Sequence, residues 1–201
     1  MKLRLSEVSS STQGRLIGDD VFVDSVAVDS RKLAPGALYV ALRGERFDGH
    51  EFVRAAEKSG AVAAMVDNEI LIDLPQVLVD DTQSALGRLA GATCKRSSAK
   101  VVAITGSNGK TTVKTLTAAI LALHGRTHVN SGNYNNEIGL PLSVLAMPDG
   151  TEFAVFEMGA GKPGDIDYLT SIARPDVALV NNVAAAHLER MGDLAGVAQT
   201  K

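Results

Sequence analysis

A glycine-rich segment, TGSNGKTT, has the residue types of a phosphate-binding loop. It lies between an apolar run, VVAIT, and a segment with helical character, TVKTLTAAILAL. Gly106 and Gly109 allow a tight turn that aims main-chain N–H groups at one point, where a helix start adds its partial positive charge. Lys110 can reach a terminal phosphate, and Thr111 can offer a hydroxyl to Mg²⁺. The segment therefore predicts a site for a nucleoside triphosphate, formed by Thr105, Gly106, Ser107, Asn108, Gly109, Lys110, Thr111 and Thr112.

The loop departs from the common form G-x-x-x-x-G-K-[ST], because Ile104 stands five positions before Gly109. The other interpretation is a glycine-rich turn between a strand and a helix that happens to carry a surface lysine. The sequence G-K-T-T between an apolar strand and a helix favours the phosphate-binding interpretation.

Polar residues follow other expected strands. Glu157 ends the apolar run FAVFE, and His187 follows VALVNNVAAA. Strand ends of an open α/β sheet face the ligand crevice, where a carboxylate suits a hard Mg²⁺ ion. Taken alone, Glu157 could equally be a solvent-facing strand end, and a lone histidine is more often structural. The segment GNYNNEIGLP also offers amides for a polar substrate, although asparagine-rich loops are often simple turns; its asparagines are Asn133, Asn135 and Asn136.

Short apolar runs alternate with helical segments along the chain, which predicts an α/β fold with a mostly parallel sheet. We expect strands at residues 21–28, 38–42, 61–66, 76–79, 101–105, 153–157 and 177–181, and helices at 50–59, after Asp81, after the glycine-rich loop, at 163–173 and after Asp193. Two domains are expected: a small α/β domain at 1–80 and a nucleotide-binding domain at 81–201.

Composition narrows the class of protein. Of 201 residues, 45% are hydrophobic and 21% charged, which is ordinary for a globular protein. A net charge of -3 and 4% aromatic residues give no support for binding nucleic acid or an anionic membrane. One cysteine fits a reducing compartment, and neither a signal peptide nor a membrane-spanning apolar run is expected from the sequence. A cytoplasmic protein is expected.

Together these motifs resemble the Mur ligases, the ATP-dependent amide-forming enzymes of peptidoglycan precursor synthesis. The resemblance covers TGSNGKTT, GNYNNEIGLP, FEMGA and AHLERMGDLAGVAQTK, and also DSRKLAPGALYVALRGERFDGHEF near the N-terminus. GNYNNEIGLP is similar to the form found in the family members that add D-alanyl-D-alanine to UDP-N-acetylmuramoyl-tripeptide. The resemblance implies ATP and Mg²⁺ as cofactors and these two compounds as substrates.

The resemblance also implies roles for individual residues. Lys110 would contact the ATP phosphates, while Thr111, Glu157 and His187 would ligate magnesium. Lys201 matches a family lysine that is often carbamylated. Residues 29–31 lie in the segment similar to the UDP-binding motif, and the three asparagines would lie near the muramoyl peptide; the residues expected at UDP are Asp29, Ser30 and Arg31.

Members of the family are longer and have a third, C-terminal domain. The resemblance therefore implies that residues 81–201 are an incomplete ATP-binding domain and that this chain is a fragment without ligase activity of its own. Three alternatives stay open: a sister ligase that adds a diamino acid, a folylpolyglutamate synthase, and a nucleotide-binding module without ligase chemistry.

Overall fold

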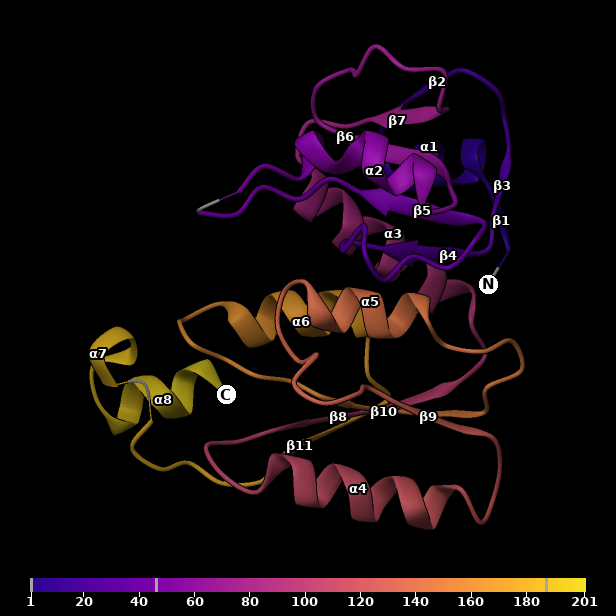
Figure 1. Ribbon diagram of the computed structural model, residues 1–201. Helices are drawn as coiled ribbons and strands as arrows, with labels where there is room; N and C mark the ends of the chain where they lie inside the picture. The colour runs from indigo at the N-terminus through magenta and orange to yellow at the C-terminus, as the bar shows by residue number, and fades with distance from the viewer. Residues whose placement is uncertain (1, 46, 187) are drawn as a thin grey trace. The chain divides into compact units, whose positions relative to one another are not determined.

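The computed structural model describes residues 2–45, 47–186 and 188–201. Its contacts divide the chain into two compact units, Met1–Leu89 and Ala90–Lys201 (Figure 1). The division falls inside one helix, later than the boundary at residues 80 and 81 that the sequence indicates. Each unit has its own sheet and core.

Unit 1 (Met1–Leu89) contains a five-stranded sheet in the order β2-β7-β6-β5-β4. From β7 to β4 neighbouring strands are parallel, and β2 pairs antiparallel with β7. The strands are β2 (Arg15–Ile17), β4 (Ser25–Ala27), β5 (Ala37–Val40), β6 (Ala61–Val66) and β7 (Gln76–Leu78). A second, antiparallel pair joins β1 (Leu3–Arg4) to β3 (Phe22–Val23).

The single strand expected at residues 21–28 is wrong, because the segment changes partners at Asp24. Its first half, β3, pairs with β1, whereas its second half, β4, pairs with β5. The Asp24 N–H donates to the Gly36 carbonyl (2.9 Å), which separates the two pairings. The helices of unit 1 are α1 (Leu5–Thr12), the 3-10 helix η1 (Gly49–Phe52), α2 (Val53–Lys58) and the first part of α3 (Thr82–Arg96).

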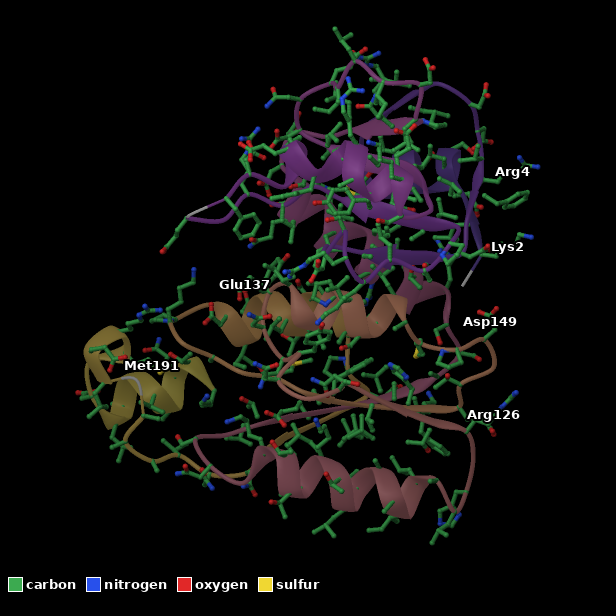
Figure 2. All side chains as sticks on the ribbon, in the orientation of Figure 1. Lys2, Arg4, Arg126, Glu137, Asp149 and Met191 are labelled. Atoms are coloured by element: carbon green, nitrogen blue, oxygen red, sulfur yellow. The ribbon has the colours of Figure 1, made fainter. Side chains whose placement is uncertain are left out.

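Unit 2 (Ala90–Lys201) contains a four-stranded sheet in the order β11-β8-β10-β9, and all its pairings are parallel. The strands are β8 (Lys100–Thr105), β9 (Thr127–Val129), β10 (Phe153–Glu157) and β11 (Val177–Val180). Parallel strands bring their carboxyl ends to one edge of a sheet. Figure 2 shows Arg126 and Asp149, which precede β9 and β10, at the end of the unit opposite Met191.

Helices cover both faces of this sheet, with α4 on one side and α5 and α6 on the other (Figure 1). They are α4 (Lys110–Leu121), α5 (Gly139–Leu145) and α6 (Asp165–Ala173), followed by α7 (Leu188–Met191) and α8 (Leu194–Thr200). The central strands β8 and β10 are apolar because they are covered on both faces; Ile104, Val155 and Phe156 are fully buried. The α/β fold with parallel sheets that the sequence predicts is thereby confirmed. No helix in the described ranges is long and apolar enough to cross a lipid bilayer.

His128 of β9 links the unit's stability to pH. Its ring packs edge-on against Phe156, its Nε2 lies 2.8 Å from the Ser143 carbonyl, and burial lowers its pKa. Because the folded pKa lies below the ordinary value of about 6.5, the unfolded chain takes up the proton first as the pH falls. The stability that neutral His128 contributes is therefore fully present above about pH 6.5. It is lost as the pH falls through the folded pKa of His128.

We expect His128→Gln to flatten this pH dependence. Urea unfolding of the variant and of the wild-type chain, above and below about pH 6.5, measures the difference. His124→Gln removes an exposed histidine and is the matched control. An unchanged pH slope in His128→Gln would contradict the assignment.

Candidate functional site

The glycine-rich loop joins β8 to α4, as its sequence requires. Gly106 and Gly109 have φ angles of +143° and +75°, which favour glycine. A Cβ on Gly109 would lie 2.8 Å from the amide nitrogen of Asn181, so a larger residue would also clash. The loop therefore depends on both glycines, and α4 begins directly after the second.

Lys110 is folded over this loop. Its Nζ donates to the carbonyls of Gly106 (2.9 Å) and Ser107 (3.4 Å). The ammonium group therefore lies beside the main chain of the loop, at the N-terminal end of α4. Thr105 has a different place, because its hydroxyl is buried and donates to the Met158 carbonyl (2.9 Å), tying β8 to β10.

Two asparagines that follow β11 hold the loop in shape. The Asn182 Oδ1 accepts from the Asn108 N–H (2.9 Å), and its Nδ2 donates to the Asn108 carbonyl (3.0 Å). The Asn181 Nδ2 donates to the same carbonyl (2.7 Å), while the Ser107 N–H donates to the Asn182 carbonyl (3.1 Å). Sequence reasoning missed both asparagines, although their position just past a strand end was a usable signal.

Glu157 is buried at the carboxyl end of β10, with 4% of its surface exposed. Its Oε2 accepts from the Thr111 hydroxyl (2.7 Å), and its Oε1 accepts from the Asn135 amide (2.8 Å). The solvent-facing interpretation of this residue is therefore wrong, because two polar side chains enclose the carboxylate. Three expected site residues, from the loop helix, the strand end and the asparagine-rich segment, thus meet.

A buried lysine completes this group, and sequence reasoning did not identify it. Lys114 is 5% exposed, and its Nζ lies 3.6 Å from the Glu157 Oε2 and donates to the Asn130 carbonyl (3.0 Å). The Asn130 side chain in turn bonds the main chain of Glu157 at both its N–H and its carbonyl, each at 2.9 Å. In the sequence Lys114 looks like one of several polar residues on a helix, so no local signal marks it.

The asparagines of GNYNNEIGLP have different environments. Asn135 contacts Glu157, whereas the Asn136 Oδ1 accepts from the N–H of Gly139 (2.8 Å) at the start of α5. Both line the cavity beside the loop, and Asn133 is exposed outside it.

That cavity has a volume of about 390 Å³ and lies at the carboxyl edge of the sheet. The loop contributes Ser107 to it, the first residue of α4 contributes Lys110, and Lys201 joins them directly after α8. Burial lowers the pKa of Lys201, the nearby charge of Lys110 lowers it further, and Asp165 opposes both. His187 lies outside the described residues. In the described part of the chain no group of three His, Cys, Asp or Glu side chains could enclose a metal ion by itself.

A second cavity, of about 570 Å³, lies within unit 1. The side chain of Arg31 donates to both carboxylate oxygens of Asp29, each at 2.9 Å, and these hydrogen bonds lower the pKa of Asp29 to about 2. Phe47 and Phe52 add half-exposed rings to the lining, and neither ring was expected from the sequence. Ser30 also lines the cavity, so the three residues expected at UDP surround a pocket with aromatic walls.

Comparisons with known proteins agree with this arrangement. Residues 104–201 match the family profile described as Mur ligase middle domain, and residues 23–94 match the one described as Mur ligase family, catalytic domain. The UDP-N-acetylmuramoyl-tripeptide--D-alanyl-D-alanine ligase of Escherichia coli strain K12 is 48% identical over 201 residues, which are all of this chain and 44% of the relative.

Solved structures give the same result. A crystal structure of MurF from Acinetobacter baumannii superimposes with a TM-score of 0.95 at 34% identity, covering 100% of this chain and 45% of that one. A crystal structure of MurF ligase from Thermotoga maritima in complex with ADP has a TM-score of 0.82 at 38% identity, covering 89% and 42%. The chain thus spans less than half the length of the relatives it matches. On the sequence motifs, the fold and these matches, the chain belongs to the Mur ligase family.

Proposed function

We propose that this chain provides the two nucleotide sites of an ATP-dependent ligase that joins D-alanyl-D-alanine to UDP-N-acetylmuramoyl-tripeptide. The observation that carries the proposal is the cluster in which Glu157 bonds Thr111 and Asn135, because Asn135 also lines one cavity with Lys110. The names of the relatives support this choice of substrates. Such a ligase acts in peptidoglycan precursor synthesis in the cytoplasm, where ATP is available.

ATP would bind with its phosphates on the glycine-rich loop. Main-chain N–H groups and the start of α4 favour negative charge there, and Lys110 would move from the loop carbonyls to the terminal phosphates. The structure of the Thermotoga maritima relative in complex with ADP supports an adenine nucleotide as the ligand. Residues 81–201 would form this ATP site and residues 1–80 the site for the UDP-linked peptide.

The residues present fit magnesium. The Thr111 hydroxyl and Glu157 carboxylate oxygens are 2.7 Å apart, close to the separation of about 3.0 Å between adjacent ligands of an octahedral ion bound at about 2.1 Å. One carboxylate and one hydroxyl, completed by phosphate oxygens and water, form the kind of ligand set that magnesium favours. His187 is proposed as a further ligand. Bound Mg²⁺ would polarise the phosphate oxygens and neutralise charge on them.

The UDP-linked substrate would occupy the cavity of unit 1. Its aromatic walls can pack against a flat base, and the N–H groups and side chains of residues 29–31 can hydrogen-bond polar groups. The residues proposed to contact the muramoyl peptide are Asn133, Asn135 and Asn136.

The proposed reaction has two steps, activation of a carboxylate and formation of the amide. The terminal carboxylate of the tripeptide attacks the γ-phosphate of ATP, giving an acyl phosphate and ADP. The amine of D-alanyl-D-alanine then attacks the acyl carbon, and phosphate leaves. Lys110 stabilises charge on the transferring phosphoryl group. Lys201, whose lowered pKa makes its amine more available as a nucleophile, is proposed to react with CO₂ to form a carbamate beside the metal.

Calorimetric titration of the 201-residue chain tests the proposal. We expect one site for ATP in the presence of Mg²⁺ and one independent site for UDP-N-acetylmuramoyl-tripeptide. Arg31→Ala should weaken only the second, because it removes the partner of Asp29 in that cavity. ATP binding without any affinity for the UDP-linked peptide would contradict the ligase proposal. It would support the alternative of a nucleotide-binding module without ligase chemistry.

Asn182→Ala should weaken ATP binding by up to about 30-fold, because loss of its two hydrogen bonds to Asn108, at about 1 kcal/mol each, frees the loop. The measurement is the same titration, with circular dichroism to verify folding. Asn68→Ala removes an exposed amide that donates to Asp67 and is the matched control. Unchanged ATP affinity in Asn182→Ala would refute this function of Asn182.

A further inference from the structure

The burial of the Lys114 side chain is energetically unfavourable, and the proposed reaction gives this residue no role. It lies on α4 one turn after Thr111, on the face of the helix that packs against β10. Its side chain is 6% exposed, and moving an ammonium group from water into such a place is unfavourable unless its partners compensate. An apolar residue would satisfy the packing of α4 against the sheet without that cost.

Both partners of Lys114 belong to the surroundings of one residue, Glu157: its own carboxylate and Asn130, which bonds its main chain. Its Nζ lies 3.6 Å from the Glu157 Oε2 and donates to the Asn130 carbonyl at 3.0 Å. Asn130, 1% exposed, holds the main chain of Glu157 through two hydrogen bonds of 2.9 Å. Lys114 is therefore connected to the Glu157 side chain directly and to its backbone through Asn130.

The position of the carboxylate depends on this arrangement. Oε1 is held by Asn135, and Oε2 is held between the Thr111 hydroxyl and Lys114. Among the described residues, no buried side-chain nitrogen or oxygen lacks a hydrogen-bond partner, so the network is complete. Lys114 approaches Oε2 from within the protein. Without it, the carboxylate has no cation on that side to keep Oε2 beside Thr111.

We propose that Lys114 is a positioning residue of the magnesium site: a buried lysine that holds Glu157 where its Oε2 and the Thr111 hydroxyl can bind one ion together. The inference rests on the proposed function in that Mg²⁺ accompanies the nucleotide at these two residues. Lys114 itself touches neither the nucleotide nor the metal. Its effect is therefore on how much Mg²⁺ strengthens nucleotide binding, not on the phosphate loop.

The test is the affinity for a non-hydrolysable ATP analogue, measured by calorimetry in excess EDTA and in saturating Mg²⁺. The ratio of the two dissociation constants gives the Mg²⁺ enhancement. For Lys114→Met we expect this enhancement to fall by about 10-fold to 100-fold, as is common when an outer partner of a metal ligand is removed. The affinity in EDTA should stay close to the wild-type value. Lys100→Met, which removes an exposed lysine paired with Asp176 at 3.0 Å, should change neither quantity.

The outcomes separate the inference from the proposed function. An unchanged or larger enhancement in folded Lys114→Met would overturn the inference, the larger value meaning that Lys114 competes with the metal. A parallel loss of affinity in EDTA and in Mg²⁺ would also overturn it, because a purely structural role would act on both. Wild-type chain that binds the analogue equally with and without Mg²⁺ would instead refute the proposed metal site.

A crystal structure of the wild-type chain with Mg²⁺ and the analogue tests the same inference if Lys114→Met does not fold. We expect Nζ of Lys114 to keep its contacts with Asn130 and Glu157 while the metal lies at Glu157 and Thr111. Movement of Lys114 onto a phosphate, or away from Glu157, would overturn the inference.

Discussion

Lys110→Ala is expected to weaken ATP binding by about 100-fold or more, because a lysine at the loop supplies charge-assisted hydrogen bonds of about 1.5–3 kcal/mol each to the phosphates. Within the described part of the chain, this lysine donates to carbonyls of its own loop and to no other element, so its removal should cost the fold little. Calorimetric titration with ATP in Mg²⁺ measures the loss. The thermal unfolding temperature without nucleotide should remain near the wild-type value.

Lys100→Ala is the control for this change, since it removes an exposed lysine at the other end of β8. Its ATP affinity should match that of the wild-type chain. Retention of wild-type affinity by Lys110→Ala would mean that the glycine-rich loop does not bind the phosphates, and that the proposed ATP site is misplaced.

Lys114→Met is expected to lower the free energy of unfolding by about 3–5 kcal/mol, the usual cost of breaking a buried ion pair. The side chains of Lys114 and Glu157 are only 6% and 5% exposed, so removing the lysine leaves a buried carboxylate without its cation. Urea denaturation without nucleotide measures the change. Lys100→Met should differ from the wild type by less than about 1 kcal/mol, because its pair is exposed.

The double variant Lys114→Met with Glu157→Gln tests the cause of that destabilisation. It removes both charges, so we expect it to be more stable than Lys114→Met alone. If the double variant lost the sum of the two single effects, the charges would not interact, and the ion pair would contribute nothing to stability.

The strands, helices and loop that are formed by contiguous residues could be predicted from the sequence. The buried strands Ala61–Val66 and Phe153–Glu157 have the bounds expected from their apolar runs, and α8 begins directly after Asp193, where a helix was expected. The glycine-rich loop could be located for the same reason, because its glycines, lysine and flanking elements are contiguous. Its position between β8 and α4 follows from these residues alone.

Features that depend on distant contacts could not be predicted in this way. The strand β9 is three residues long and α5 begins at a glycine and contains Pro141, so neither has a clear period in the sequence. The importance of Lys114 arises only when β10 and Asn130 are brought beside α4. Likewise, Asn182 acquires its partner Asn108 across 74 residues of chain.

The most direct test of the proposed ligase function is a calorimetric comparison of three ligands with the 201-residue chain: UDP, UDP-N-acetylmuramoyl-dipeptide and UDP-N-acetylmuramoyl-tripeptide. We predict that all three bind one site in unit 1 and that the tripeptide binds most tightly, because its peptide adds contacts beyond the nucleotide. Tighter binding of the dipeptide would favour a ligase that adds the third residue. Absence of binding by all three, with ATP binding intact, would contradict the account.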